Sequence, residues 1–357
     1  MIITFIYSNC VEDQIRVQLR CRNIVDAINR TGIHSANVLD MNAFAQNTPD
    51  AQKMCAKSDI LVIYRYLYGP ILTALQYWKA RDKKVVVDFD QAINYLSAGM
   101  PGYSFWFDGI PFEDHTSGDK NIISPNPLEQ FKWGLGMVDA ATVSSGRLVD
   151  DWSQFTKVYQ VSDYINTYQY PALNQTHENE IWVGLGNYVN YYNFKNTGVL
   201  SAMENVCKAR PQVRLVLCNM EKIVGAGLDI DPAQIKIFSP SYFEDWVSIL
   251  LKLDIGLAPL YGDYDLRLGM GDMLEFMISK IPCIASGQMN LLPLSRYGQM
   301  VENALDTWQS TILNTVDHLG VYQKKAAKEP FLYAISQDVS ANVEKVLKVY
   351  TSIINQF

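Results

Sequence analysis

The sequence has few cysteines and histidines, and neither residue type forms a cluster. Its 357 residues include six cysteines and four histidines. No C-x-x-C pair, zinc-ligand spacing or catalytic-triad pattern joins them, which argues against a dense disulfide scaffold, a zinc site and a serine hydrolase. The motifs G-x-S-x-G and G-x-x-x-x-G-K-[ST] are also absent, so the sequence contains neither a nucleophile elbow nor a P-loop.

Long apolar runs and an excess of positive charge are missing as well. No stretch approaches the roughly 20 apolar residues that a membrane span needs. The first residues, MIITFIYSNCVEDQ, lack a basic start and predict a first strand rather than a signal peptide. The formal net charge is −7, so no broad basic surface is expected for DNA or anionic lipids. We therefore expect a cytoplasmic protein and leave peripheral membrane association open.

Short apolar runs alternate with helical patterns along the chain, which is typical of parallel α/β layers. Hydrophobic residues make up 48% and charged residues 19% of the chain, which is a globular composition. In the first half, helices are expected near 14–31, 70–80, 128–137 and 146–153, between strands with the sequences ITFIY, SANVLD, DILVIYRY, KVVVDFD, DAATVSS and KVYQVSD. This order predicts one Rossmann-like domain over residues 1–163.

A polar segment without periodicity, at 164–179, predicts an interdomain linker. The α/β pattern then restarts with the strands EIWVGLG, RLVLCN, IKIFSP, DIGLAPL and PCIAS. It predicts a second Rossmann-like domain over residues 180–335. The last residues, 336–357, carry apolar side chains at helical spacing and predict one amphipathic terminal helix.

The most informative segment runs from Asp254 to Ser286. It contains the strand DIGLAPL, a polar loop with Gly269 and Gly271, a helix that carries Glu275 in its first turns, and the strand PCIAS. An open parallel sheet binds its ligand beyond the carboxyl ends of its strands, and a helix N-terminus there suits a phosphate group. A carboxylate one turn further in can accept hydrogen bonds from sugar or ribose hydroxyls. The segment therefore predicts a nucleotide-sugar cradle.

This segment resembles the donor-binding signature of retaining glycosyltransferases of the two-Rossmann-domain (GT-B) type, family 4-like ("glycosyl transferases group 1"). The family pattern E-[YF]-M-A-x-G-x-P-[VC]-[VI]-A-[ST] is matched by EFM at 275–277 and PCIAS at 282–286, and the strand LDIGLAPL at 253–260 also matches. The resemblance implies two facing Rossmann-like domains with a cleft between them and a terminal helix that crosses back to the first domain. It also implies sugar transfer with retention of the anomeric configuration.

The sequence departs from the family at positions that usually carry positive charge. The run YDLRLGMGDMLEF most resembles a subgroup with the pattern Y-D-x-R-R-S-x-x-K-x-L-E-[YF], whose second Arg and Lys are replaced by Leu268 and Asp272. The turn VGLGNY at 183–188 also lacks the usual Arg and Lys, for which Asn187 and Lys195 are the nearest substitutes. Part of the expected phosphate-binding charge is therefore missing.

The resemblance assigns roles on the donor side. Glu275 matches the carboxylate that binds the ribose hydroxyls; without the resemblance it would be a helix-start Glu that complements the helix dipole. Arg267 is suited to bidentate contact with the leaving diphosphate, or else it pairs with Asp263 or Asp265 at the surface. We assign the catalytic roles to Arg267 and Asp265, with Asp265 contacting the transferred sugar. Glycines expected to let the backbone approach the phosphates are Gly184, Gly186, Gly269 and Gly271.

The acceptor side is expected at strand ends of the first domain. The residues there are Asp88, Asp90, Arg65 and Tyr66. The two carboxylates either contact acceptor hydroxyls or cap the following helix. No further oxygen ligands accompany this D-x-D pair, so no metal site is predicted. The long loop at 98–115 carries aromatic residues that either stack on an acceptor or cover the domain core.

The sequence thus predicts a glycosyltransferase that moves a sugar from a nucleoside diphosphate sugar to a hydroxyl of a sugar, lipid-linked or small-molecule acceptor. It predicts no required cofactor, and a nucleic-acid partner is not expected. Two alternatives stay open: a non-catalytic GT-B protein that binds a sugar or nucleotide, and an enzyme of the same fold that glycosylates modified DNA bases. For the transferase, Glu275→Ala is expected to weaken donor binding and to leave the fold intact.

Overall fold

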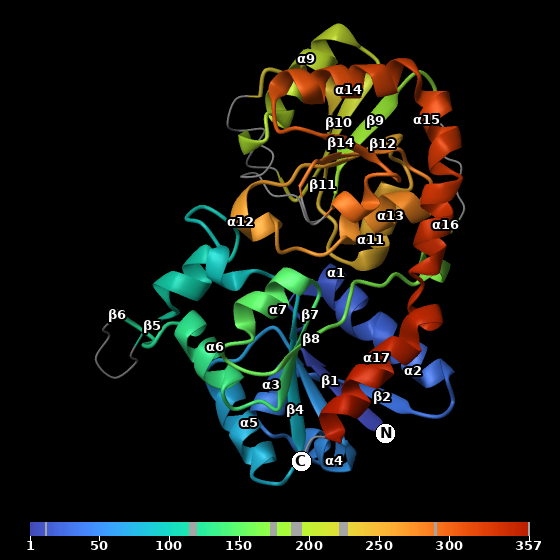
Figure 1. Ribbon diagram of the computed structural model, residues 1–357. Coiled ribbons are helices and arrows are strands. Elements are labelled where there is room, and N and C mark those ends of the chain that lie inside the picture. The colour runs from blue at the N-terminus through green and yellow to red at the C-terminus, as the bar shows by residue number, and fades with distance from the viewer. Residues whose placement is uncertain are drawn as a thin grey trace. The chain divides into compact units, whose positions relative to one another are not determined.

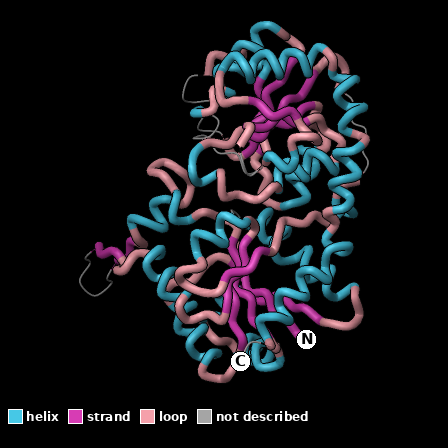
Figure 2. Tube along the Cα trace, in the orientation of Figure 1, coloured by secondary structure: helices cyan, strands magenta, loops and turns pink. Residues whose placement is uncertain are grey.

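The chain forms two compact α/β units. The computed structural model describes residues 1–10, 13–113, 120–171, 177–186, 195–220, 228–288 and 291–355. Unit 1 comprises Met1–Asp163, Arg267–Gly269 and Asn342–Phe357, and unit 2 comprises Tyr164–Leu266 and Met270–Ala341. Each unit contains one six-stranded sheet covered by helices (Figure 2). The predicted fold class, α/β with two Rossmann-like domains, is confirmed.

Unit 1 is built on a parallel sheet with the strand order β2-β1-β3-β4-β7-β8. The central strands are buried on both faces, which explains why their sequences are almost continuously apolar. The strands are β1 (Ile2–Tyr7), β2 (Ser35–Asp40), β3 (Ile60–Tyr64), β4 (Lys84–Phe89), β7 (Ala140–Val143) and β8 (Val158–Gln160). A separate antiparallel pair consists of β5 (Pro111–Glu113) and β6 (Lys120–Ile122).

The helices of unit 1 begin at sequence signals that can be recognised in the chain. Side chains of Asp40, Thr48, Asn126 and Ser145 accept hydrogen bonds from the first turns of four of them. The helices are α1 (Gln14–Val17), α2 (Asn23–Arg30), α3 (Met41–Ala45), α4 (Pro49–Lys57), α5 (Pro70–Lys79), α6 (Pro127–Leu135) and α7 (Gly146–Trp152). A π-helical turn at Gln18–Arg22 joins α1 to α2, so the predicted helix near 14–31 is one continuous element with a widened turn.

The terminal helix α17 (Val339–Ile354) is amphipathic, as predicted, and residues from Asn342 onward belong to unit 1 (Figure 1). The ring of Tyr350, which is fully buried, meets the ring of Phe5 of β1 edge to face with centroids 6.0 Å apart. The helix therefore completes the hydrophobic core of unit 1.

Unit 2 contains a second parallel sheet, with the order β11-β10-β9-β12-β13-β14. Its strands are β9 (Ile181–Leu185), β10 (Val213–Cys218), β11 (Ile235–Phe238), β12 (Ile255–Ala258), β13 (Cys283–Ser286) and β14 (Gln299–Val301). All but β14 were predicted from the sequence. The three residues of β14 are too few to show a period.

The helices of unit 2 are α9 (Val199–Ala209), α11 (Phe243–Leu250), α12 (Gly262–Asp265), α13 (Gly271–Ile278), α14 (Leu305–Asp317), α15 (Leu319–Ala326) and α16 (Glu329–Ser336). Buried side chains of α9 and α14, including the fully buried Trp308, form one hydrophobic core with the sheet. Figure 1 shows α9 and α14 next to each other over β9 and β10. The sequence predicted α9, α11 and α13 but not α12, where a polar loop was expected, nor the helices from α14 to α16.

Candidate functional site

Both sheets change direction beside their first strand. In unit 1 the connections run outward from β1 to β2 on one side and to β3 on the other, and in unit 2 they run from β9 to β10 and to β12. The carboxyl ends of the strands at such a switch point are where open α/β sheets bind ligands. Asp88, Arg65 and Tyr66 lie at the carboxyl ends of β4 and β3 in unit 1, and Gly186 follows β9 in unit 2.

In unit 1, Arg65 follows β3 with an unusual backbone conformation. Its φ is +68°, a left-handed value that costs free energy in a residue with a side chain. The guanidinium is 4% exposed, is ion-paired with Asp13, and donates to the hydroxyl of Tyr64 at 2.7 Å and to Asp90 at 3.2 Å. Tyr66 donates from its hydroxyl to Asp13 at 2.9 Å. The structure thus brings Arg65, Tyr66 and Asp90 together at one edge of unit 1, and their assignment to the acceptor side stays a prediction.

Asp88, at the end of β4, is part of a second buried ion pair at the same edge. Arg20, from the π-helical turn, donates to both of its carboxylate oxygens, from Nε at 3.1 Å and Nη2 at 2.6 Å. The same guanidinium donates to the backbone oxygen of Val161 at 2.7 Å and to Asp163 at 3.3 Å. Burial opposes the charge of Arg20, yet Asp88 and Asp163 hold its pKa well above the usual value. Asp88 does not cap a helix; it anchors this arginine.

Asp90 is a buried carboxylate of the same edge that is surrounded by arginines. Burial alone would raise its pKa, but the guanidinium groups of Arg16, Arg65 and Arg20 outweigh that effect and hold the pKa below its ordinary range. Arg16 donates to Asp90 at 2.8 Å, and the hydroxyl of Tyr64 donates to the other oxygen at 3.1 Å. The edge therefore keeps an ionised, buried carboxylate with a fixed orientation, and both of its oxygens accept hydrogen bonds from the protein.

The aromatic loop predicted at 98–115 packs against this edge of unit 1. Trp106, which is 3% exposed, stacks on Tyr66 with centroids 5.9 Å apart and meets Phe131 of α6 edge to face. Phe105 contacts Tyr66 edge to face at 5.8 Å. The loop therefore covers the domain core, and at the same time it fixes the position of Tyr66.

Arg267 and Gly269, predicted beside the diphosphate, belong to unit 1 in the structure. The Arg267 guanidinium donates to both oxygens of Asp151 at 2.5 and 3.2 Å and lies over the ring of Tyr95, 3.5 Å from its centroid. Neither sequence alternative named Asp151 as its partner. Gly269 lies against Asp163 so closely that a Cβ there would overlap the carboxyl group. Its role in the structure is to allow this approach.

Asp163 gives unit 1 a measurable pH dependence. Burial raises the pKa of Asp163 to about 6, against the opposing charge of Arg20. Because the folded state binds this proton more tightly than the unfolded state, stability falls as pH rises from about 4 to about 6. The raised pKa corresponds to about 2–3 kcal/mol. We expect Asp163→Asn to remove this loss. The unfolding free energy of the variant, relative to that of the wild type, should therefore be higher at pH 7 than at pH 4.5.

Urea unfolding at both pH values tests this expectation. Asp90 acts in the opposite direction, because its lowered pKa adds stability that is lost only as pH falls below about 4. Its contribution is therefore constant across the tested window. An Asp163→Asn variant with the same pH dependence as wild type would show that Asp163 is ionised throughout.

In unit 2, Glu275 lies in the second turn of α13 and is fully buried. One carboxylate oxygen accepts from the hydroxyl of Tyr170 at 2.9 Å, and the other accepts from the indole Nε1 of Trp246 at 3.0 Å. Two buried donors from distant parts of the chain thus converge on this side chain. Sequence analysis missed both. The tryptophan on the buried face of α11, Trp246, could have indicated a buried hydrogen-bond acceptor nearby.

The start of α13 lies against the turn that follows β9. A Cβ at Gly186 would overlap the carboxyl group of Asp272, so only glycine permits this approach. Asp272 is 7% exposed and lies in the first turn of the helix, where its negative charge complements the helix dipole. Gly271 is the first residue of the helix, and Gly184 lies within β9 against Leu253. The predicted phosphate position therefore has a carboxylate beside it.

The remaining predicted residues are placed as follows. Asp265, at the end of α12, is fully buried and accepts from the backbone N–H of Tyr261 at 2.5 Å. Lys195 is exposed. Asn187 lies outside the described residues. The sequence analysis also missed Arg20, Asp13 and Asp163. The position of Asp163 at the end of a predicted strand could have identified it.

Among the residues that the structure describes, no three or more His, Cys, Asp or Glu side chains are grouped to hold a metal ion. None of the described helices is long and apolar enough to cross a membrane.

The comparison with known proteins finds matches among solved structures. No protein-family model matches the sequence. No curated protein matches it either.

Solved structures do match over almost the full chain. Sucrose-phosphate synthase from Thermosynechococcus elongatus has a TM-score of 0.66 at 13% identity, covering 99% of each chain. HepE from Anabaena, solved with UDP and glucose, has a TM-score of 0.64 at 11% identity, covering 99% of this chain and 100% of its own. The chain has the GT-B fold.

The GT-B fold supports more than one reaction on nucleotide sugars. UDP-GlcNAc 2-epimerase from Neisseria meningitidis, bound to UDP-GlcNAc, matches with a TM-score of 0.55 at 9% identity over 99% of this chain and 100% of its own. At these identities the likeness establishes the fold alone, and activity has to be argued from the site.

Proposed function

We propose that this protein is a glycosyltransferase that moves a sugar from a nucleoside diphosphate sugar to an acceptor hydroxyl, with retention. One observation carries the proposal. At the switch point of unit 2, the glycine turn after β9 meets the N-terminus of α13, and a carboxylate lies one turn inside that helix. Backbone N–H groups at a helix start suit the diphosphate, and an internal carboxylate suits the ribose.

The transferase needs to stabilise a departing diphosphate and an oxocarbenium-like sugar. The N-terminus of α13 supplies the fixed dipole for the diphosphate. Arg267 is the proposed cation, and its charge is balanced by Asp151 in the structure, so a diphosphate would have to replace that carboxylate. At the edge of unit 1, Asp90 and Tyr66 are the proposed contacts to the acceptor. Asp265 remains the proposed contact to the transferred sugar.

A second candidate function follows from the carboxylate of Asp272. An acidic side chain lies beside the predicted phosphate position, and the sequence lacks the Arg and Lys that the resembled family usually carries after the first strand of this domain. The acidic side chain and the missing basic residues favour a second function, in which a GT-B protein binds a nucleotide sugar weakly and without turnover. Both candidates share the cradle and differ in affinity and in product formation.

A thermal-shift screen against UDP, GDP, ADP, CDP and dTDP sugars, with and without Mg²⁺, tests the proposal. A ligand that binds the native state raises the melting temperature by mass action, by several degrees at about 100 times its Kd. We expect one nucleotide to stand out. Asp272→Asn is expected to increase that shift, because it removes the repelling charge. Asp306→Asn, an exposed acid in the first turn of α14, is the matched control and should change nothing.

The nucleotide sugar found in this way is then incubated with candidate acceptors, and products are separated by chromatography. Transfer or hydrolysis of the sugar supports the transferase. Binding without any product supports the second candidate. The absence of a shift with every nucleotide, in wild type and in Asp272→Asn alike, would refute the cradle.

A further inference from the structure

At the carboxyl edge of unit 2, three hydrogen bonds form a closed ring that joins the ends of β12, β13 and β14. The backbone N–H of Leu260, just after β12, donates to the hydroxyl oxygen of Ser286 at 2.9 Å. The Ser286 hydroxyl donates to Oδ1 of Asn303 at 2.6 Å, and Nδ2 of Asn303 donates to the backbone oxygen of Leu260 at 2.8 Å. Two side chains thus hold both polar backbone atoms of one residue.

The direction of each bond in this ring follows from the chemistry of the groups. Only the nitrogen of the Asn303 amide can donate to a carbonyl oxygen, so Oδ1 has to face the Ser286 hydroxyl. The hydroxyl then donates to Oδ1 and keeps a lone pair for the N–H of Leu260. Ser286 is fully buried and Leu260 is 6% exposed, so the loss of a bond would leave a polar group with little access to water.

The carbonyl that Asn303 holds belongs to a peptide bond that also orients Asp265. The oxygen of Leu260 and the N–H of Tyr261 are the two polar groups of one planar trans peptide, and they point to opposite sides of it. The N–H of Tyr261 donates to Oδ2 of Asp265 at 2.5 Å. One rigid peptide plane therefore links the amide of Asn303 to the carboxylate of Asp265.

The helix that carries Asp265 depends on this peptide for its orientation. α12 runs from Gly262 to Asp265 and has only four residues, with Tyr261 as its N-cap. A single helical turn has almost no stability of its own, because it fixes several dihedral angles for few hydrogen bonds. A rotation of the peptide before it would therefore turn the helix and the Asp265 side chain with it.

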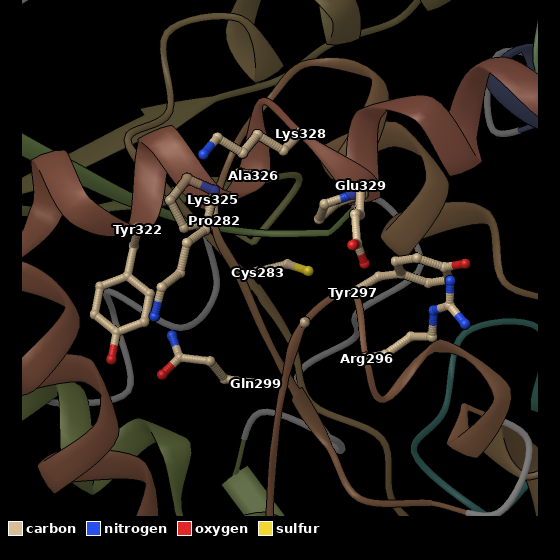
Figure 3. A pocket seen from close by; sticks show the side chains of 12 residues that line it. Pro282, Cys283, Arg296, Tyr297, Gln299, Tyr322, Lys325, Ala326, Lys328 and Glu329 are labelled. Carbon is tan, nitrogen blue, oxygen red and sulfur yellow. The ribbon is translucent and has the colours of Figure 1, made fainter.

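The position of Asn303 is set by the sheet. Val301 of β14 pairs with Ser286 of β13, and Asn303 follows two residues later. The strands are packed tightly at their amino ends too, where a Cβ at Gly298 would lie 2.8 Å from the sulfur of Cys283. Those amino ends line the pocket of about 380 Å³ in Figure 3, so the hydrogen-bonded ring lies at the opposite end of the strands from that pocket.

We propose that Asn303 is a positioning residue for Asp265. The inference rests on the proposed function, in which Asp265 contacts the transferred sugar. Through the Leu260–Tyr261 peptide, Asn303 fixes the direction of the Asp265 carboxylate before a sugar binds. A polar group that is already oriented needs no reorganisation during the reaction, which is where its contribution to the rate arises.

Amide hydrogen exchange at Tyr261 tests the geometry without any ligand. It can be followed by NMR on protein with isotope-labelled tyrosine, with the signal assigned through Tyr261→Phe. We expect Asn303→Ala to speed this exchange about tenfold, because the peptide loses one of its hydrogen bonds. The matched control is Asn205→Ala. Asn205 of α9 is also half-buried and donates from Nδ2 at 2.8 Å, to Gln309 of α14, so its loss should leave exchange at Tyr261 unchanged.

Turnover of the nucleotide sugar identified by the thermal-shift screen tests the role in the reaction. Asn303→Ala should lower kcat about tenfold with a smaller change in KM, because Asp265 is proposed to act on the sugar in the transition state. Asn303→Asp keeps the acceptor for Ser286 but loses the donor to Leu260, and we expect the same defect from it. Asn205→Ala should keep the wild-type kcat and KM, whereas a general effect of lost stability would lower the activity of all three variants.

Unchanged exchange at Tyr261 in both Asn303 variants would overturn the proposal whatever the activity of the protein. Faster exchange with an unchanged kcat would also overturn it, since the peptide would then move without affecting the sugar. If the wild type forms no product with any nucleotide sugar, the proposed function fails and the role of Asn303 at the sugar fails with it. The exchange rates separate the two failures, because they report on the peptide alone.

Discussion

Glu275→Ala is expected to lower the free energy of unfolding of unit 2 by about 2–5 kcal/mol. The substitution leaves the hydroxyl of Tyr170 and the indole N–H of Trp246 without their buried acceptor. A buried donor without a partner costs about 1–3 kcal/mol, and here two lose theirs at once. The sequence predicted that this change would leave the fold intact. The full burial of the side chain leads to the opposite expectation.

Urea unfolding followed by tryptophan fluorescence measures this effect, since Trp246 is itself a partner of the carboxylate. Glu275→Gln is the matched variant, because its amide oxygen keeps an acceptor for one of the two donors. We expect its loss of stability to be smaller than that of the alanine variant. Tyr170→Phe in the Glu275→Ala background should recover part of the loss, since it removes one orphaned hydroxyl. An alanine variant as stable as wild type would show that the two donors find other partners.

These variants also bear on the proposed ribose contact. Each carboxylate oxygen can accept more than one hydrogen bond, so the bonds from Tyr170 and Trp246 do not by themselves exclude a ribose contact. If Glu275 binds the ribose, Glu275→Gln should weaken nucleotide binding more than its small change in stability explains. If its role is confined to the core of unit 2, nucleotide binding should follow stability.

Arg20→Met is expected to destabilise unit 1 by about 3–5 kcal/mol. Arg20 is 2% exposed and donates to Asp88, Asp163 and a backbone oxygen. Removing one partner of a buried ion pair leaves uncompensated buried charge, which is the costly case. Methionine keeps much of the volume, so the loss reports on charge and hydrogen bonds and not on a cavity.

The matched control for Arg20→Met is Arg210→Met. Arg210 also forms a two-pronged ion pair, with Asp317, but this pair is exposed to solvent. Exposed pairs contribute little, so we expect a small change there. Adding Asp88→Asn to Arg20→Met should restore part of the lost stability by removing one unpaired charge. The measurement is the urea midpoint by circular dichroism. Equal midpoints for the Arg20 and Arg210 variants would contradict a structural role for the buried network.

Much of the fold can be predicted from short stretches of the sequence. Apolar runs such as ILVIY at Ile60–Tyr64 and the helices that begin after Asn126 and Ser145 could be predicted without reference to the rest of the chain, whereas the short helices α3 and α4 were missed. Their order predicts two parallel α/β layers, because strands separated by helices pair in parallel. The glycine turn after β9 and the helix that carries Glu275 could be located in the same way.

The partners of the site residues could not be predicted. Arg267 is bonded to Asp151, 116 positions away, Glu275 to Tyr170, 105 positions away, and Arg20 to Asp88, 68 positions away. No periodicity connects such pairs, since periodicity reports only which face of an element is buried. A charged residue at a strand end looks the same in the sequence whether it faces a ligand or a buried counter-ion.

The sequence by itself therefore determined the fold class and most of the strands, and it located the segment in which we propose the donor cradle. The tertiary structure alone decided which charges are neutralised by the protein and which are left available. Asp88 and Glu275 have buried partners, Asp272 lies at the glycine turn, and Arg296 and Lys325 line a pocket without an ion pair to any described residue. The physical reason is that burial and pairing arise from long-range packing, whereas helix and strand formation follows from the pattern of neighbouring side chains.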